Sequence, residues 1–203
     1  MDNMMQSEVP FRVALAIVIV LTVAVTLYHR IQAASSREKI SRKEEGYFFA
    51  IALRLAGLSL FVVTIAYLVS PSLVQWSKIQ LSSSVRWVGV VTGLLSSLLM
   101  FWTLNSLGKN LTDTVVTRVN ATLVTHGPYR WVRHPFYVTT ALVMISVTLL
   151  TANWIIGIAS LIVLSMLVSR TSKEEQMLIE RFGQQYLDYM ASAGRFVPRS
   201  SRK

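Results

Sequence analysis

The chain has 203 residues, of which 53% are hydrophobic and 15% charged, and its mean hydropathy is +0.50. Charged residues make up about a quarter of an ordinary soluble domain. This composition therefore excludes an ordinary soluble domain and favours a polytopic membrane protein. Cysteine is absent, which excludes disulfides, thiolate-bound metal and a cysteine nucleophile, and the formal net charge of +10 first reports topology rather than a nucleic-acid partner.

Three apolar blocks in the first half of the chain predict transmembrane helices, at residues 11–28, 47–69 and 86–107. A bilayer core about 30 Å thick needs about 20 helical residues. The first block follows Pro10 and lacks a small-residue cleavage site, so we expect it to remain as an anchor. The second ends before Pro71, because the residue before a proline disfavours α geometry.

Two further apolar blocks, 136–150 and 154–169, are separated only by Thr151-Ala152-Asn153. Each is shorter than a comfortable span, so we expect a thin, tilted or re-entrant hairpin over residues 136–169. The predicted fold is therefore an all-α integral membrane protein with about five transmembrane helices, a C-terminal helical hairpin and a cytoplasmic amphipathic helix.

This pattern divides the chain into two predicted domains. Residues 1–107 hold the N-terminal transmembrane helices, with a solvated cytoplasmic loop at 31–45. Residues 108–203 hold a cytoplasmic connector, the hairpin, the amphipathic helix and the tail.

Basic residues set the predicted orientation. With five crossings, sixteen of the twenty lysines and arginines fall on one side of the membrane, and only Arg12, Lys78 and Arg86 fall on the other. The positive-inside rule then predicts an outer N-terminus and a cytoplasmic C-terminus. We expect Arg54, inside the second span, to snorkel towards the cytoplasmic interface. No acidic residue falls within a predicted span, which argues against a proton relay or a cation-coupled transporter.

Polar residues gather in two stretches that a hairpin would bring to the same end of the molecule. The first stretch ends in Gly127-Pro128-Tyr129-Arg130 and then Arg133-His134-Pro135-Phe136-Tyr137. Gly127-Pro128 predicts a turn, and Pro135 suits the first turn of a helix. Arg133 and His134 would then stand at a helix N-terminus, which favours an anionic carboxylate nearby.

The second stretch begins at Arg170 and contains Glu174-Glu175. On a continuing helix Arg170 and Glu174 share a face, which by itself predicts an ordinary ion pair. An apolar stripe interrupted at Gly183 follows, as in an amphipathic helix on the membrane surface or on the hairpin. The stripe consists of Leu178, Phe182, Tyr186 and Tyr189.

In combination, the two stretches resemble the isoprenylcysteine carboxyl methyltransferase family and its prokaryotic relatives over about residues 105–198. The resemblance rests on the arginine-histidine-proline element, the hairpin, Arg170, Glu174-Glu175 and Phe182-Gly183-Gln184-Gln185-Tyr186-Leu187-Asp188-Tyr189. It implies an integral-membrane methyltransferase that uses S-adenosylmethionine and releases S-adenosylhomocysteine. The implied pocket is built by the last two helices and the C-terminal segment, with its active site in the cytoplasm.

The resemblance also implies roles for individual residues. Arg133 and His134 would contact the cofactor carboxylate, Glu174 or Glu175 the ribose hydroxyls or the ammonium, and aromatic residues the adenine ring. The expected cofactor-binding residues are Gly127, Tyr129, Arg133, His134, Pro135, Tyr137, Glu174, Glu175, Phe182 and Tyr186. The expected catalytic residues are Arg170 and Glu174, and no metal is expected.

The expected acceptor is a lipophilic small molecule or a prenylated group delivered by the lipid bilayer. An acceptor carboxylate is already ionised and needs orientation, for which Arg170 is suited, whereas an amine needs a base such as His134 or a glutamate. The alternatives are a phospholipid amine N-methyltransferase, a sterol or polyene reductase, which the residues after Tyr137 disfavour, and a non-catalytic membrane scaffold. The sequence leaves the oligomeric state open.

Overall fold

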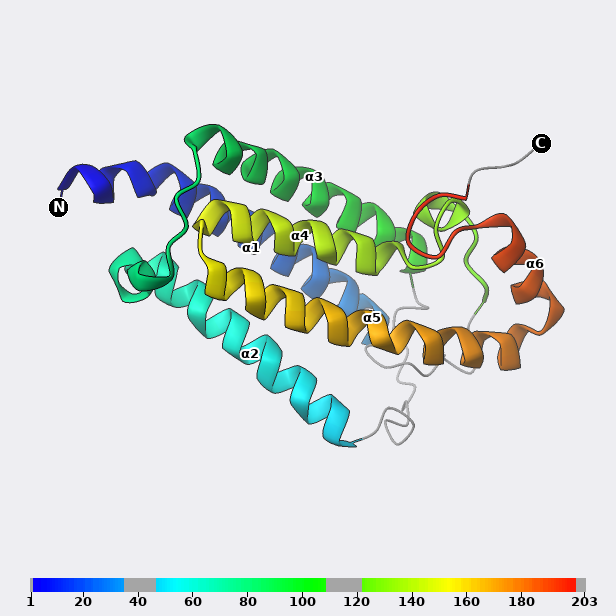
Figure 1. Cartoon of the computed structure of the whole chain (residues 1–203). Helices are drawn as coiled ribbons and strands as arrows, with labels where there is room; N and C mark the ends of the chain where they lie inside the picture. Colours follow the sequence, from blue (N-terminus) through cyan, green and yellow to red (C-terminus); the bar gives the residue numbers. More distant parts are fainter. Residues whose placement is uncertain (1, 35–46, 109–121, 200–203) are drawn as a thin grey trace.

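The computed structural model describes residues 2–34, 47–108 and 122–199, and these form a helical bundle. Figure 1 shows the long helices running side by side, with the start of α1 at one end of the bundle and α6 and the C-terminus at the other. The elements are α1 (Asp2–Ala34), α2 (Tyr47–Val69), the 3-10 helix η2 (Pro71–Ser77), α3 (Ser83–Leu107), the 3-10 helix η4 (Gly127–Arg130), α4 (Pro135–Thr151), α5 (Trp154–Phe182) and α6 (Gln184–Ser192).

The described helices confirm an all-α integral, multi-pass membrane fold. Helices α1, α2, α3 and α5 are long and apolar enough to cross a bilayer. Helix α4 is apolar but has only 17 residues, or about 26 Å at 1.5 Å per residue, which is short of a hydrocarbon core of about 30 Å. The short span expected in the hairpin is therefore α4.

The second half of the hairpin differs from the expectation. Helix α5 continues without a break from Trp154 through Arg170 to Phe182, so it has 29 residues rather than a short segment ending at 169. The polar residues after 169 thus extend a transmembrane helix by about three and a half turns. The break comes at Gly183, whose φ of +54° is a left-handed conformation that favours glycine.

Helix α1 also begins earlier than predicted. It starts at Asp2 and runs through Pro10, so Glu8 lies inside a membrane-spanning helix. The expectation that no acidic residue falls within a span is wrong for this position. Pro10 removes one backbone hydrogen bond but leaves the helix intact, and the tertiary partners of Glu8 hold the first turns in place.

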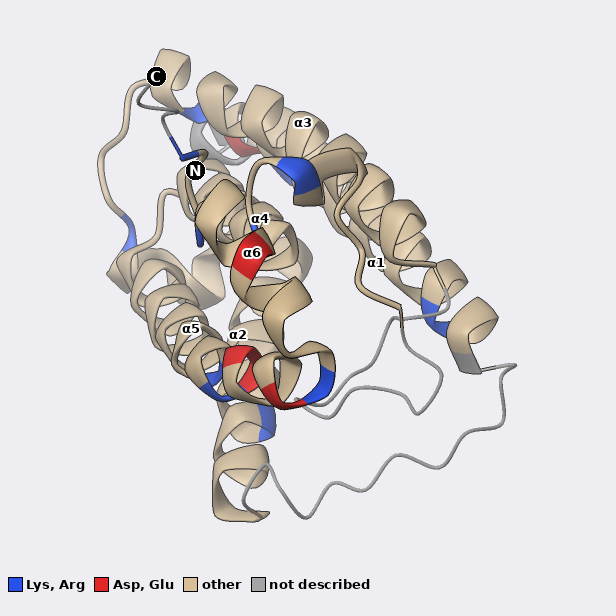
Figure 2. Cartoon of the chain, turned by 90° about the vertical axis from the view of Figure 1, so that its right-hand side faces the viewer, with Lys and Arg blue, Asp and Glu red and all other residues tan. Residues whose placement is uncertain are grey.

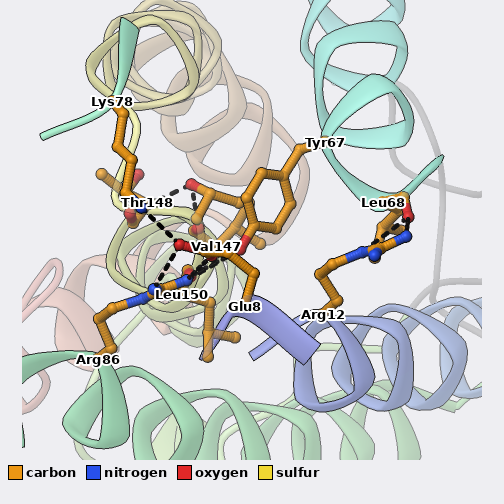
Figure 3. Close-up of polar contacts among 10 residues, drawn as sticks. Glu8, Arg12, Tyr67, Leu68, Lys78, Arg86, Val147, Thr148 and Leu150 are labelled. Carbon is orange, nitrogen blue, oxygen red and sulfur yellow. Dashed lines mark hydrogen bonds and ion pairs between the residues drawn. The ribbon is translucent and has the colours of Figure 1, made fainter. Parts of the chain in front are cut away.

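Glu8 lies at the centre of a buried polar cluster that joins α1, α2, η2, α3 and α4, which we call the Glu8 cluster (Figure 3). Arg86 donates to both Glu8 oxygens at 3.1 and 2.6 Å, and Lys78 donates to Oε1 at 2.7 Å. The hydroxyl of Tyr67 donates to Oε2 at 2.8 Å. Arg86 and Glu8 are each about 5% exposed, so the carboxylate and the guanidinium neutralise each other away from water.

The basic residues predicted for the outer face therefore have defined partners. Besides Glu8, Arg86 donates to the carbonyl of Leu150 at 3.1 and 2.6 Å, which satisfies an open carbonyl in the last turn of α4. Arg12 donates to the carbonyls of Leu68 and Val69 at the end of α2. These arginines cap helix C-termini in addition to any topological role.

Small residues allow α3 to approach α4 and α1 closely. A Cβ at Gly89 would lie 2.9 Å from Cβ of Leu149, and one at Gly93 would lie 2.6 Å from a methyl group of Val18. Ser146 of α4 donates to the carbonyl of Gly89 at 2.7 Å. Close backbone approach with a hydrogen bond across the interface is typical of helix packing in membranes.

Two predicted loops fall mainly outside the described residues. Positions 35–46 of the expected cytoplasmic loop and 109–121 of the expected connector lie there, whereas positions 31–34 belong to α1. Arg54 is exposed on α2, and its snorkelling towards the interface stays a prediction.

We predict that Glu8→Gln lowers the free energy of unfolding by about 3 kcal/mol, because it leaves the buried Arg86 guanidinium without its counter-charge. Denaturant unfolding of detergent-purified protein measures the change. Arg30→Gln, which removes an exposed cation at the far end of α1, is the control.

The double variant Glu8→Gln with Arg86→Met should recover part of the loss, because neither buried charge then remains. A Glu8→Gln variant as stable as Arg30→Gln would show that the cluster does not stabilise the bundle.

Candidate active site

The C-terminal segment folds back onto the chain just before α4. The backbone N–H of Arg133 donates to the carbonyl of Gly194 at 2.8 Å, and that of His134 donates to the carbonyl of Arg195 at 3.1 Å. Gly194 donates in return to the carbonyl of Trp131 at 3.1 Å. A short parallel pairing of Val132 with Gly194 results, and it brings the tail to the N-terminus of α4.

Tyrosines fix this docking from the side of α6. The hydroxyl of Tyr189 donates to the carbonyl of Tyr129 at 2.6 Å, and the rings of Tyr186 and Tyr189 lie 5.8 Å apart. Burial raises the pKa of Tyr129, Tyr186 and Tyr189 above the ordinary value for a phenol. These hydroxyls are therefore protonated at neutral pH, and that of Tyr189 is a donor.

Arg133 lies between α5 and the C-terminal segment. Its Nε donates to Oε1 of Glu175 at 3.0 Å, and its Nη1 donates to the carbonyls of Met190 and Ala193 at 3.2 and 2.6 Å. A planar guanidinium suits such simultaneous contacts. Arg133 thus connects the start of α4, the last third of α5 and the end of α6.

His134 immediately precedes α4, and its ring faces both glutamates. Nε2 lies 3.1 Å from Oε1 of Glu175, and Nδ1 lies 3.7 Å from Oε2 of Glu174. The ring also contacts Tyr137 and Phe196, with centroids 5.7 and 5.8 Å away. At 5% exposure, His134 is the buried centre of the site.

The two neighbouring glutamates occupy different surroundings. Glu175 faces two guanidinium groups and an imidazole ring, because Nη2 of Arg195 lies 3.4 Å from its Oε2 in addition to the contacts with Arg133 and His134. Glu174 accepts a short hydrogen bond from the hydroxyl of Tyr137, and its side chain is 18% exposed against 11% for Glu175. Figure 2 shows acidic and basic residues together at this end of α5.

The hairpin therefore brings together five of the residues expected to bind the cofactor. They lie at the N-terminus of α4, where the helix dipole favours negative charge. Pro135 is the first residue of that helix, as the sequence predicts. The five are Arg133, His134, Tyr137, Glu174 and Glu175.

Other expected site residues lie around this group. Gly127 opens η4 with a φ of +59°, and a side chain there would collide with Ser106 of α3. Tyr129 is buried, and its carbonyl accepts the hydrogen bond from the hydroxyl of Tyr189. Phe182 and Tyr186 belong to the apolar cluster between α5 and α6. Their contact with a cofactor remains a prediction.

Arg170 lies on α5, half-buried, one helical turn before Glu174. Because an α-helix has 3.6 residues per turn, Arg170 and Glu174, which are four residues apart, lie on the same face of α5. The position is at the junction between the apolar part of α5 and the ionic residues of the site.

Sequence reasoning missed Arg195 and Phe196 of the C-terminal segment. Arg195 contacts Glu175 and donates to Ser172 at 3.0 Å, and its Nε is buried without a hydrogen-bond partner among the described residues. In the sequence, Arg195 is one of several basic residues in the tail, and only the folded-back backbone distinguishes it from the others.

Comparison with known proteins links this arrangement to a family. The model of the isoprenylcysteine carboxyl methyltransferase family matches residues 88–180. Protein-S-isoprenylcysteine O-methyltransferases from Mus musculus and Tribolium castaneum are 44% identical over 69 residues and 32% identical over 114 residues. The matches cover 34% and 55% of this chain, but only 24% and 41% of those relatives, so this chain aligns with less than half of either protein.

The fold agrees with a solved structure over most of the chain. The eukaryotic intramembrane Ras methyltransferase isoprenylcysteine carboxyl methyltransferase has a TM-score of 0.53 to this structure at 22% identity. The alignment covers 91% of this chain and 67% of that one. In the matched segment, the curated relatives and the shared fold, this chain is similar to the isoprenylcysteine carboxyl methyltransferase family.

Proposed function

We propose that the protein is a membrane-embedded, S-adenosylmethionine-dependent methyltransferase that acts on a carboxylate of a lipophilic acceptor. The observation that supports this most is the ionic group at the N-terminus of α4, where Arg133, His134 and Tyr137 meet Glu174 and Glu175. These residues lie within the segment that matches the family.

The donors and acceptors of the site fit S-adenosylmethionine. The cofactor carries a carboxylate, an ammonium, ribose hydroxyls and an adenine ring, and the site offers a guanidinium, carboxylates and aromatic rings within one region. When bound, it supplies a methyl group on a sulfonium, which favours in-line transfer to a nucleophile. The buried Nε of Arg195, which lacks an acceptor among the described residues, suits the carboxylate.

The contacts suggest a division of roles among the side chains. Arg133 has its Nε and Nη1 bonded within the protein, so its role is to position Glu175 and the C-terminal segment. Glu174 is the more exposed carboxylate and can accept from an ammonium or from ribose hydroxyls. Phe196 and Tyr137 flank His134 and provide apolar surface beside it.

A carboxylate acceptor suits this site better than an amine. An amine must lose a proton during methylation, yet both ring nitrogens of His134 already face carboxylate oxygens. A carboxylate needs only orientation and exclusion of water, which Arg170 at the end of the apolar part of α5 can provide. The curated relatives are named for O-methylation of an isoprenylcysteine, which is consistent with a lipophilic acceptor.

We predict that Glu174→Gln, Arg195→Gln and His134→Ala each weaken the binding of S-adenosylhomocysteine about ten- to a hundredfold, the usual effect of losing a charge-assisted contact. Isothermal titration of detergent-solubilised protein measures the affinity. Asp188→Asn is the matched control, because Asp188 is an exposed acid on α6 whose side chain bonds to Gln184. Affinities equal to wild type in all three variants would remove the cofactor from this site.

Arg170→Ala should lower turnover while leaving that affinity unchanged, because its proposed partner is the acceptor. Transfer of a labelled methyl group to a prenylated cysteine analogue should give an ester that alkali hydrolyses. Label in alkali-stable form on phospholipid amines would indicate the amine alternative, and no transfer to any membrane extract despite cofactor binding would indicate a scaffold.

The proposed orientation places the N-terminus outside and the active site in the cytoplasm, because with five crossings sixteen of the twenty lysines and arginines fall on the side of the C-terminus. The chain has no cysteine, so single cysteines can be introduced at Gln75 of η2 and Gln185 of α6, both exposed. A membrane-impermeant maleimide should label position 75 in intact cells and position 185 only after permeabilisation. Labelling of both positions from the same side would contradict this topology.

A further inference from the structure

The end of the bundle opposite the active site contains a cavity next to the Glu8 cluster. Its volume is about 160 Å³, and its lining comes from the start of α1, the end of α2, η2 and the turn between α4 and α5. Glu8, Tyr67 and Lys78 converge there (Figure 3). The remaining wall includes Pro71 and Val74 of η2.

Tryptophans place this cavity at the level of the membrane surface. Trp76 of η2 and Trp154 at the start of α5 are 69% and 43% exposed, and their rings meet at 5.8 Å. Trp87, near the start of α3, is also exposed. Tryptophans at helix ends are typical of the head-group region of a bilayer. The cavity therefore lies beside lipid head groups.

The charges around the cavity do not balance. Glu8 supplies one negative charge, which Arg86 engages with two hydrogen bonds, and Lys78 adds a second positive charge to the same carboxylate. The Lys78 side chain is 34% exposed, and Glu8 is its hydrogen-bond partner among the described residues. An ammonium has three N–H donors, so Lys78 has donors left for a further acceptor.

The backbone holds Lys78 in place. It pairs with Asn153, and the following residue, Ile79, donates to the carbonyl of Ala152 at 2.7 Å. The Asn153 side chain donates to Val74 and Ser77 of η2 and accepts from the first amides of α5. Lys78 thus extends from a backbone that is held by hydrogen bonds, and the Asn153 side chain in the cavity wall is already bonded to the protein.

We propose that this cavity binds an anionic phospholipid of the surrounding leaflet, with the head-group phosphate on Lys78 and the adjoining chain on Pro71 and Val74. Charge complementarity selects the anion, since Lys78 and Arg86 exceed Glu8 by one positive charge. A zwitterionic head group brings its own cation and gains less from this surplus. The site is independent of the methyltransferase function and lies at the other end of the bundle.

The proposal is tested by lipid binding to detergent-purified full-length protein, with phosphatidylglycerol and phosphatidylcholine of identical acyl chains. Native mass spectrometry counts the bound lipid, and thermal unfolding reports stabilisation. We expect phosphatidylglycerol to bind about ten- to a hundredfold more tightly, as for one charge-assisted contact. Lys78→Gln should abolish this preference and Lys78→Arg should retain it.

Lys173→Gln is the matched control, because it removes an exposed lysine at the opposite end of α5. Ser72→Trp keeps every charge but fills the mouth of the cavity from an exposed position, so it should reduce binding even if Lys78→Gln fails to fold. An unchanged preference in Lys78→Gln, an equal loss in Lys173→Gln, or full binding by Ser72→Trp would overturn the proposal. Competition by soluble glycerol phosphate as strong as by the lipid would overturn the assignment to a lipid.

Discussion

The C-terminal half of the molecule depends on the contacts that the carboxylate of Glu175 makes. This carboxylate faces Arg133, His134 and Arg195, which come from two chain segments far apart in sequence. Leaving a buried carboxylate without these partners would cost several kcal/mol, so the three side chains are held around it. The segment just before α4, the last third of α5 and the tail after α6 are thereby fixed relative to one another, and the candidate active site exists only where they meet.

The same constraint acts at the other end of the bundle. Glu8 is buried by the packing of α1 and is neutralised by Arg86, which also satisfies the last turn of α4. Between the two ionic groups the helices contact one another through small and apolar residues, such as Gly89 and Gly93 against α4 and α1. A buried carboxylate paired with basic side chains at each end and close packing in the middle together fix helices that gain little from the hydrophobic effect inside a bilayer.

The sequence predicts best what depends on local hydropathy. The range 47–69 and the turn at Ala152-Asn153 agree with α2 and the hairpin, because apolar runs and their interruptions are properties of neighbouring residues. The pairing of the two polar stretches follows from the hairpin and is also confirmed. The start of α1 depends on Glu8, whose partner Tyr67 lies more than fifty residues away in the sequence. The position of Arg195 depends on Glu175, twenty residues away. No local sequence pattern encodes either contact.

The difference between Glu174 and Glu175 shows where burial adds information that spacing lacks. Both glutamates lie near the start of α4. Because adjacent residues of an α-helix point about 100° apart, only one of the two side chains can face the interior. Glu175 is the interior one, and its oxygens already face Arg133, His134 and Arg195, so replacing it would disturb the scaffold of the site. Glu174 is turned towards Tyr137 and is more exposed. A ligand can therefore reach Glu174 without breaking the network that Glu175 holds together.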